Sequence, residues 1–150
     1  MPNPALAQDT WQNPPEPIAA FLDAPFLPQA FISPDNQWLF TLEHPPLEPL
    51  ASLAQPRIQV AGLQINPATY APALEYGYCS LTVQHIATGQ VNTLALPSDA
   101  RIRNFRWSPS SRYLAFTNTR PEGLELWLLD VPQGTIKRLL PPIPVSYTHL

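Results

Sequence analysis

The side chains that could carry acid–base chemistry are few and widely spaced. His44, His85 and His149 are the three histidines of the sequence, and histidine is the most common general base in proteins. Their spacing does not match the one-turn separation of two zinc ligands on a helix. Because lone histidines are more often exposed or structurally satisfied than catalytic, we expect no catalytic residue and no metal site among them, with His85 facing solvent or lying next to a sheet edge.

One carboxylate and one group of arginines are further candidates. Asp35 follows a Ser-Pro pair, where an aspartate is better explained as a turn residue that bonds to its own backbone. Arg101, Arg103 and Arg106 could contact acidic groups of a substrate, because bidentate bonds between arginine and carboxylate are strong. Strand alternation predicts Arg101 and Arg103 on one face and Arg106 on the other, so solvated strand residues are the competing interpretation.

Aromatic residues suggest a second kind of site, a platform that stacks bases or sugars. They recur at matching positions of two stretches rich in strand-forming residues, so packing between repeats is the simpler interpretation. Cys79 has no second cysteine to pair with and is expected to be a small buried apolar residue. The aromatic set comprises Trp38, Trp107, Trp127, Phe31, Phe40, Phe105 and Phe116.

The composition limits the partners and the compartment. The chain has 150 residues, a net charge of −3 and no run of like charges, which argues against binding to nucleic acid or to an anionic membrane. We find no signal peptide and no apolar stretch near the roughly 20 residues of a membrane span. An unpaired thiol fits a reducing compartment, so we predict a cytoplasmic protein without a cofactor.

The elements that hold these residues form two copies of one pattern. Ser33-Pro34 recurs as Ser108-Pro109, and residues 81–94 align with residues 126–139, including Gly89 with Gly134. Residues 101–108, 112–119, 124–131 and 135–140 are rich in strand formers and separated by turn signals. Four-stranded antiparallel units repeated at this spacing are typical of β-propeller blades. The 21 prolines also argue against a helical bundle.

The two alignments differ in offset by about 30 residues, which places an insertion in the first copy. We therefore predict an all-β partial β-propeller of two four-stranded blades with a short N-terminal helix. The insertion would cover a sheet edge or extend a sheet, with a helical piece at 47–54 and an apolar run at 57–65. The predicted divisions are an extension (1–15), a short helix and linker (16–29), a first blade (30–97, insertion 45–79), a second blade (98–140) and a tail (141–150).

Several strings resemble a known family. "LDAP" before the first Ser-Pro turn, "AGLQINP" in the insertion, and the second-copy strand "RIRNFRWSP" resemble, in this order, the N-terminal propeller of prolyl oligopeptidase-family serine peptidases. The likeness runs from about residue 11 to residue 140 and is greatest to the glutamyl endopeptidase-like subgroup. In that family a C-terminal α/β-hydrolase domain carries a Ser-Asp-His triad, and the propeller gates or orients peptide substrates.

The resemblance therefore implies a portion of a serine peptidase that does no catalysis itself. A nucleophile elbow needs Gly-x-Ser-x-Gly, and no two of the 5 glycines bracket a serine in that way. The implied partners are the missing hydrolase domain, the remaining blades and a peptide substrate. The final "VSYTHL" does not continue the repeat and is expected to be non-native from about residue 145. A non-enzymatic propeller that acts as a protein-binding scaffold is the alternative.

Overall fold

The computed structural model describes residues 14–22, 24–45, 47, 53–70, 72–73 and 77–143. Within them the chain is mainly β, with antiparallel pairing throughout the sheets, so the all-β prediction is confirmed. The elements in chain order are α1 (Glu16–Leu22), β1 (Gln29–Ile32), β2 (Trp38–Glu43), β3 (Ile58–Val60), β4 (Leu63–Ile65), β5 (Ser80–His85), β6 (Val91–Thr93), β7 (Ile102–Trp107), β8 (Tyr113–Arg120), β9 (Gly123–Asp130) and β10 (Thr135–Ile143).

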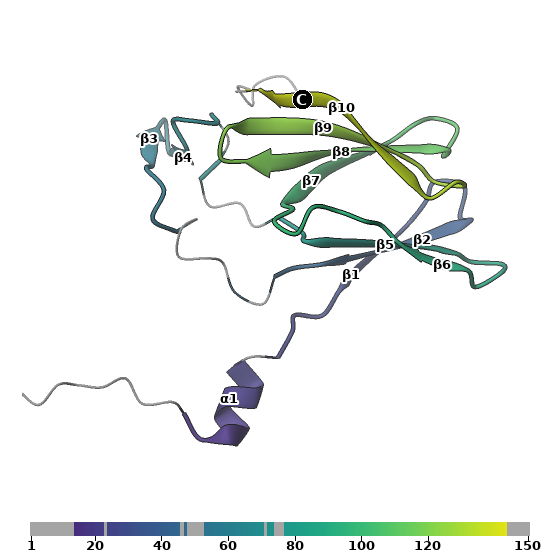
Figure 1. Ribbon diagram of the computed structural model, residues 1–150, viewed down its shortest axis with the longest axis horizontal. Coiled ribbons are helices and arrows are strands. Elements are labelled where there is room, and N and C mark those ends of the chain that lie inside the picture. Colours follow the sequence, from purple (N-terminus) through teal and green to yellow (C-terminus); the bar gives the residue numbers. More distant parts are fainter. Residues whose placement is uncertain are drawn as a thin grey trace, which may run out of the picture.

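Two four-stranded sheets form the body of the molecule (Figure 1). The first sheet has the order β1-β2-β5-β6 and the second the order β10-β9-β8-β7, so each is a meander of strands that follow one another in the chain. The hairpin β3–β4 interrupts the first meander and forms a small sheet of its own. Ala61 and Gly62 join its strands, both with positive φ, as a two-residue turn of the mirror-image type requires.

The two larger sheets pack face to face through one apolar core. Phe40, Leu42, Leu81 and Val83 come from the first sheet, and each is at most 3% exposed. Their counterparts on the facing surface of the second sheet are Ile102, Leu114, Phe116 and Leu129. The rings of Phe40 and Trp107 meet edge to face across the interface, with centroids 4.8 Å apart. Burial of these large side chains is the main force that holds the sheets together.

An irregularity in β7 overturns the predicted alternation of its side chains. Arg103 pairs with Thr117 and Arg106 with Ala115, so β7 has one residue more than β8 over this stretch. Asn104 takes a φ of 54° within the resulting bulge. Since Ala115 and Thr117 point to the same side of β8, Arg103 and Arg106 share a face. The prediction that Arg106 lies opposite Arg103 is therefore wrong.

The insertion ends by pairing with the edge of the second sheet. Tyr78 and Ile102 exchange both backbone hydrogen bonds, at 2.9 and 3.0 Å, in an isolated antiparallel bridge. A Cβ at the preceding Gly77 would lie 2.8 Å from the backbone of Arg101, so only glycine permits this close approach. The apolar run at 57–65 forms the hairpin β3–β4. Most of the helical piece predicted at 47–54 lies outside the described residues.

The short helix α1 lies apart from both sheets (Figure 1). It begins after Pro15, whose carbonyl accepts hydrogen bonds from the amides of Ile18 and Ala19. None of its residues is buried, and Phe21 is 81% exposed. The helix therefore contributes nothing to the core that joins the sheets.

Candidate functional site

The two Ser-Pro turns have the same hydrogen bonds at equivalent positions. In the first, the Ser33 amide donates to the Trp38 carbonyl at 2.9 Å and the Trp38 amide donates to Ser33 Oγ at 3.0 Å. In the second, Ser108 and Tyr113 repeat both bonds at 2.9 and 3.0 Å. The repeat seen in the sequence is thus a repeat of local geometry, and the serine hydroxyl closes each turn.

The polar groups inside each turn complete this arrangement. Ser33 Oγ donates to Asp35 Oδ1 at 2.5 Å, and in the second turn Ser110 Oγ lies 3.1 Å from Ser108 Oγ. The hydrogen bond from Ser33 is the largest influence on the Asp35 carboxyl and lowers its pKa. Asn36 and Ser111 each adopt a positive φ, of 58° and 54°. Asp35 therefore acts as a turn residue whose first oxygen is already bonded.

A groove of about 510 Å³ lies between the two turns. Arg112 lines the groove, but its guanidinium donates to Asp130 Oδ2 from Nη2 at 3.0 Å and from Nε at 3.3 Å. Contact with Asp130 raises the pKa of Arg112 further above its usual range. The groove is lined by one carboxylate, one guanidinium and otherwise uncharged residues, so charges of one sign do not gather in it. Its lining comprises Asp35, Gln37, Trp38, Ser110, Ser111, Arg112, Pro132 and Gln133.

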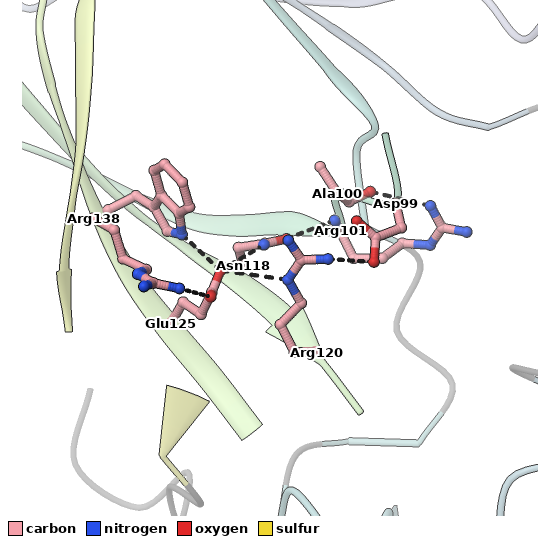
Figure 2. A network of polar contacts seen from close by, with 8 residues as sticks. Asp99, Ala100, Arg101, Asn118, Arg120, Glu125 and Arg138 are labelled. Carbon is pink, nitrogen blue, oxygen red and sulfur yellow. Dashed lines mark hydrogen bonds and ion pairs between the residues drawn. The ribbon is translucent and has the colours of Figure 1, made fainter. Parts of the chain in front are cut away.

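Figure 2 shows a second polar cluster, which we call the Glu125 network. It lies on the face of the second sheet that meets the core, because Glu125 alternates in phase with the core residue Leu129. The Glu125 side chain is 3% exposed. Its Oε2 accepts hydrogen bonds from Asn118 Nδ2 and Trp127 Nε1, both at 2.9 Å, and its Oε1 accepts one from Arg138 Nη1 at 3.0 Å. Arg120 Nε lies 3.5 Å from Oε2. The buried carboxylate is thus surrounded by donors and compensated by two guanidinium groups.

The network also joins the segment between β6 and β7 to the second sheet. Arg120 forms an ion pair with Asp99, which lies in the segment that leads from β6 to β7. The Arg101 amide donates to Asn118 Oδ1 at 2.8 Å, and the Thr119 amide donates to the Arg101 carbonyl at 2.9 Å. Figure 2 shows this path of contacts from Asp99 to Glu125. The cluster therefore fixes the entry of the chain into β7.

The charges of the network stabilise one another. Burial by itself raises the pKa of the Glu125 carboxyl. Hydrogen bonds from Asn118, Trp127 and Arg138, together with the charge of Arg120, outweigh burial and hold that pKa below its usual value. The hydrogen bond to Arg120 lowers the pKa of Asp99, and the same contact raises the pKa of Arg120. At neutral pH Glu125 is therefore an ionised anchor with its acceptor positions occupied, which is unlike a general acid or base.

The predicted site residues are not gathered into one site. His85 shares a face with Val83 and is half-buried, with its ring 4.7 Å from that of Trp38. It lies on β5 beside the edge strand β6, so of the two placements expected for it the structure shows the one next to an edge. His44 packs against Tyr78 with ring centroids 4.3 Å apart, and His149 lies outside the described residues. Cys79 is partly rather than fully buried, and its thiol donates to the Glu43 carbonyl at 3.5 Å.

The aromatic residues are mostly packing elements. Phe40 and Phe116 belong to the core, and Trp38, Phe105, Trp107 and Trp127 pack against it. Phe31 is the exception, at 49% exposed on the edge strand β1. A continuous stacking platform for bases or sugars would need several exposed rings in a row. The packing interpretation is therefore confirmed for six of these seven residues.

Sequence reasoning missed the Glu125 network. The signal was a charged residue in phase with apolar ones, because Glu125 shares its strand face with Trp127 and Leu129. Asn118 is likewise in phase with Leu114 and Phe116 on β8. A polar residue on the apolar face of a strand needs hydrogen-bond partners when that face is buried. Those partners come from neighbouring strands, so they are seen only once the strands are paired.

Within the residues that the structure describes, no group of three or more histidine, cysteine, aspartate or glutamate side chains could hold a metal ion. The helix in this part of the chain is too short to cross a membrane.

Comparisons with known proteins point towards peptidases. The chain is 29% identical over 141 residues to a protein named probable glutamyl endopeptidase, chloroplastic, from Oryza sativa subsp. japonica, and 26% identical over 139 residues to one of the same name from Arabidopsis thaliana. Each match covers 86% of this chain but only 15% and 14% of the relative. No family model matches. The chain thus resembles a small part of these proteins and is distantly related to them.

Proposed function

We propose that this chain forms two successive blades of a β-propeller in a serine peptidase-like protein. The observation that carries the proposal is the repetition of one four-stranded meander with matching turns and with the two copies packed face to face. Propellers are built by repeating such sheets around a central axis. The likeness to two probable glutamyl endopeptidases supports a peptidase as the parent.

In this proposal the blades gate or orient peptide substrates for a C-terminal α/β-hydrolase domain, and the 150-residue chain does no catalysis itself. Its remaining blades and the hydrolase domain are its partners, and it works in the cytoplasm. Of the three arginines with predicted substrate contact, we retain Arg101, which is held at the start of β7 by the bonds to Asn118 and Thr119. Arg103 and Arg106 lie on a sheet face that another part of the protein can cover.

The first experiment is to extend the reading frame from which this chain comes and to express the longer protein. A fluorophosphonate probe, which reacts with activated serines, is expected to label the longer protein and to leave the 150-residue chain unlabelled. In the longer protein, Arg101→Gln is expected to raise the KM for peptides with glutamate while kcat stays unchanged. Arg57→Gln, in the insertion, is the matched control.

A protein-binding scaffold without enzymatic activity is the alternative. It predicts further sheets without a Gly-x-Ser-x-Gly elbow and no labelling by the probe. Labelling at such an elbow would exclude the scaffold, and a longer protein that is never labelled would contradict the peptidase proposal.

A further inference from the structure

The two Ser-Pro turns share their hydrogen bonds but differ in the side chains that line the groove between them. Where the first turn has Asp35 and Gln37, the second has Ser110 and Arg112 at the equivalent positions, and all four line the groove. The second turn closes without a carboxylate, and the first closes without a guanidinium. Each turn thus forms without the charge that the other turn brings to the groove.

The carboxylate of Asp35 is held in place through one of its two oxygens. Oδ1 accepts hydrogen bonds from Ser33 Oγ at 2.5 Å and from the Gln37 amide at 3.2 Å. No hydrogen bond joins Oδ2 to a residue that the structure describes, and Asp35 is exposed. Since the pKa of Asp35 is lowered, the carboxyl is ionised at neutral pH. Asp35 therefore offers the groove one charged oxygen on a side chain that is already oriented.

The guanidinium of Arg112 is held in place in a similar way. Nη2 and Nε donate to Asp130 Oδ2, and the guanidinium carbon lies 5.1 Å from the centre of the Tyr113 ring. Nη1 takes part in neither hydrogen bond, and the Arg112 side chain is 51% exposed. Arg112 can therefore donate from Nη1 to an anion in the groove while it keeps its contact with Asp130.

These two opposite charges line one groove without pairing with each other. The structure shows no ion pair between Asp35 and Arg112, because each is bonded to partners of its own turn or strand. A ligand that carries both charges can therefore bond to both residues without breaking an existing contact. Side chains that are already oriented also lose less conformational freedom when the ligand binds.

The uncharged part of the lining indicates what lies between the charges of the ligand. Gln37 and Gln133 are exposed, and each carries a primary amide that can donate and accept hydrogen bonds. A peptide group has one donor and one acceptor, so such amides can pair with it. Trp38 and Pro132 add apolar surface. The groove volume of about 510 Å³ is that of a small-molecule site, which suits a peptide of a few residues.

We infer that this groove binds a short peptide with free ends, whose ammonium group bonds to Asp35 and whose carboxylate bonds to Arg112. The site lies at the other end of β7 from Arg101, so it is separate from the substrate contact proposed above. Hydrolysis of a protein chain releases such peptides, whereas an internal segment of a chain carries neither charged end. Only this link to hydrolysis rests on the proposed function, because the groove is formed by the two sheets of this chain.

Calorimetric titration of the longer protein with trialanine tests the inference. The protein is first reacted with the fluorophosphonate probe, so that a hydrolase site does not cleave the peptide. N-acetyl-trialanine lacks the ammonium group and trialanine amide lacks the carboxylate. We expect each blocked peptide to bind about tenfold more weakly than trialanine, because each loses one charge-assisted hydrogen bond. This comparison uses the unaltered protein, so it does not depend on how a variant folds.

Variants then assign each end of the peptide to its residue. Asp35→Asn should weaken the binding of trialanine about tenfold and leave that of N-acetyl-trialanine unchanged, because the acetylated peptide has no ammonium group to lose. Arg112→Gln, which introduces the residue of the first turn, should likewise weaken trialanine and leave trialanine amide unchanged. Glu122→Gln, in the exposed turn before β9 and outside the groove lining, is the charge-matched control for Asp35→Asn and should change neither affinity.

The outcomes separate this inference from the proposed function. Equal binding of the three peptides, or no binding of trialanine, overturns the inference even if the probe labels the protein. Binding that depends on the charged ends but is unchanged in Asp35→Asn and Arg112→Gln also overturns it, because the peptide then lies elsewhere. The expected pattern in a protein that the probe never labels supports the inference and contradicts the peptidase.

Discussion

The two four-stranded sheets share a backbone plan but differ in what their matching faces hold. The positions of Asn118, Glu125, Trp127 and Arg138 in the second sheet correspond to Glu43, Ser80, Thr82 and Thr93 in the first. The second-sheet set is a network around a buried carboxylate, whereas the first-sheet set is polar and leaves the Thr82 and Thr93 hydroxyls 3.4 Å apart. The repeat thus preserves turns and register, while burial decides which chemistry each face carries.

Turn glycines illustrate the conserved part of the plan. Gly89 and Gly134 close equivalent hairpins with φ of 70° and 62°, a conformation that side chains other than glycine rarely adopt. Both donate their amides back into the turn, Gly89 to the carbonyl of His85, four residues earlier, and Gly134 to that of Val131, three residues earlier. The two hairpins thus share the glycine position and its positive φ, while their hydrogen bonds differ by one residue. The faces, by contrast, are set by what packs on them.

The largest expected effect is the loss of the aromatic anchor of the first sheet. Phe40→Ala removes a ring that is 3% exposed and in contact with Trp107, so we expect unfolding free energy to fall by about 3–5 kcal/mol. Urea unfolding followed by tryptophan fluorescence measures the change. Phe31→Ala, its neighbour across β1 and β2, is 49% exposed and should cost far less. Equal losses would mean that the sheets do not share one core.

The second expected effect concerns the carboxylate of the second sheet. Glu125→Gln replaces one acceptor oxygen with a donor amide that faces donors from Asn118, Trp127 and Arg138. We expect a loss of about 3 kcal/mol in the same unfolding measurement, because the buried donors of Asn118 and Trp127 lose their charged acceptor. Glu122→Gln, in the exposed turn before β9, is the matched control and should change stability by about 0.5 kcal/mol or less. A loss no larger than that of the control would show that the network is solvated.

The same carboxylate should make stability depend on pH. Its pKa is lowered in the folded chain, so its contribution is complete above the unfolded value of 4.5 and is lost as pH falls through the folded pKa. Unfolding at a series of pH values should show that the difference between the wild type and Glu125→Gln narrows below that value. A difference that stays constant down to strongly acidic pH would contradict the assigned pKa direction.

The smallest expected effects compare the two Ser-Pro turns. Ser33→Ala and Ser108→Ala each remove the hydroxyl that accepts from the Trp38 or Tyr113 amide, and each should cost about 1 kcal/mol. Ser33→Ala should cost more, because Ser33 is 2% exposed and also bonds to Asp35. Thermal unfolding of the two variants side by side tests the order. The reverse order would mean that Asp35 does not support its turn.

Much of this arrangement could be predicted from the sequence, because it depends on short-range geometry. The Ser-Pro turns, the hairpin glycines and the four strands of the second copy follow from residue types a few positions apart. Offsets between the copies also located the insertion that contains β3 and β4. Each of these features is determined by backbone preferences and by local hydrogen bonds, so no knowledge of distant contacts was needed.

Only the tertiary structure determined which side chains share a sheet face and which of them are buried. The extra residue in β7 moves Arg106 to the side of Arg103, and strict alternation along the strand could not reveal that bulge. Likewise, His85 gains a ring partner and Glu125 gains four donors only when separate strands pair. Whether a polar residue is solvated or buried depends on residues far away in the chain, because desolvation is a property of the packed sheets rather than of the strand.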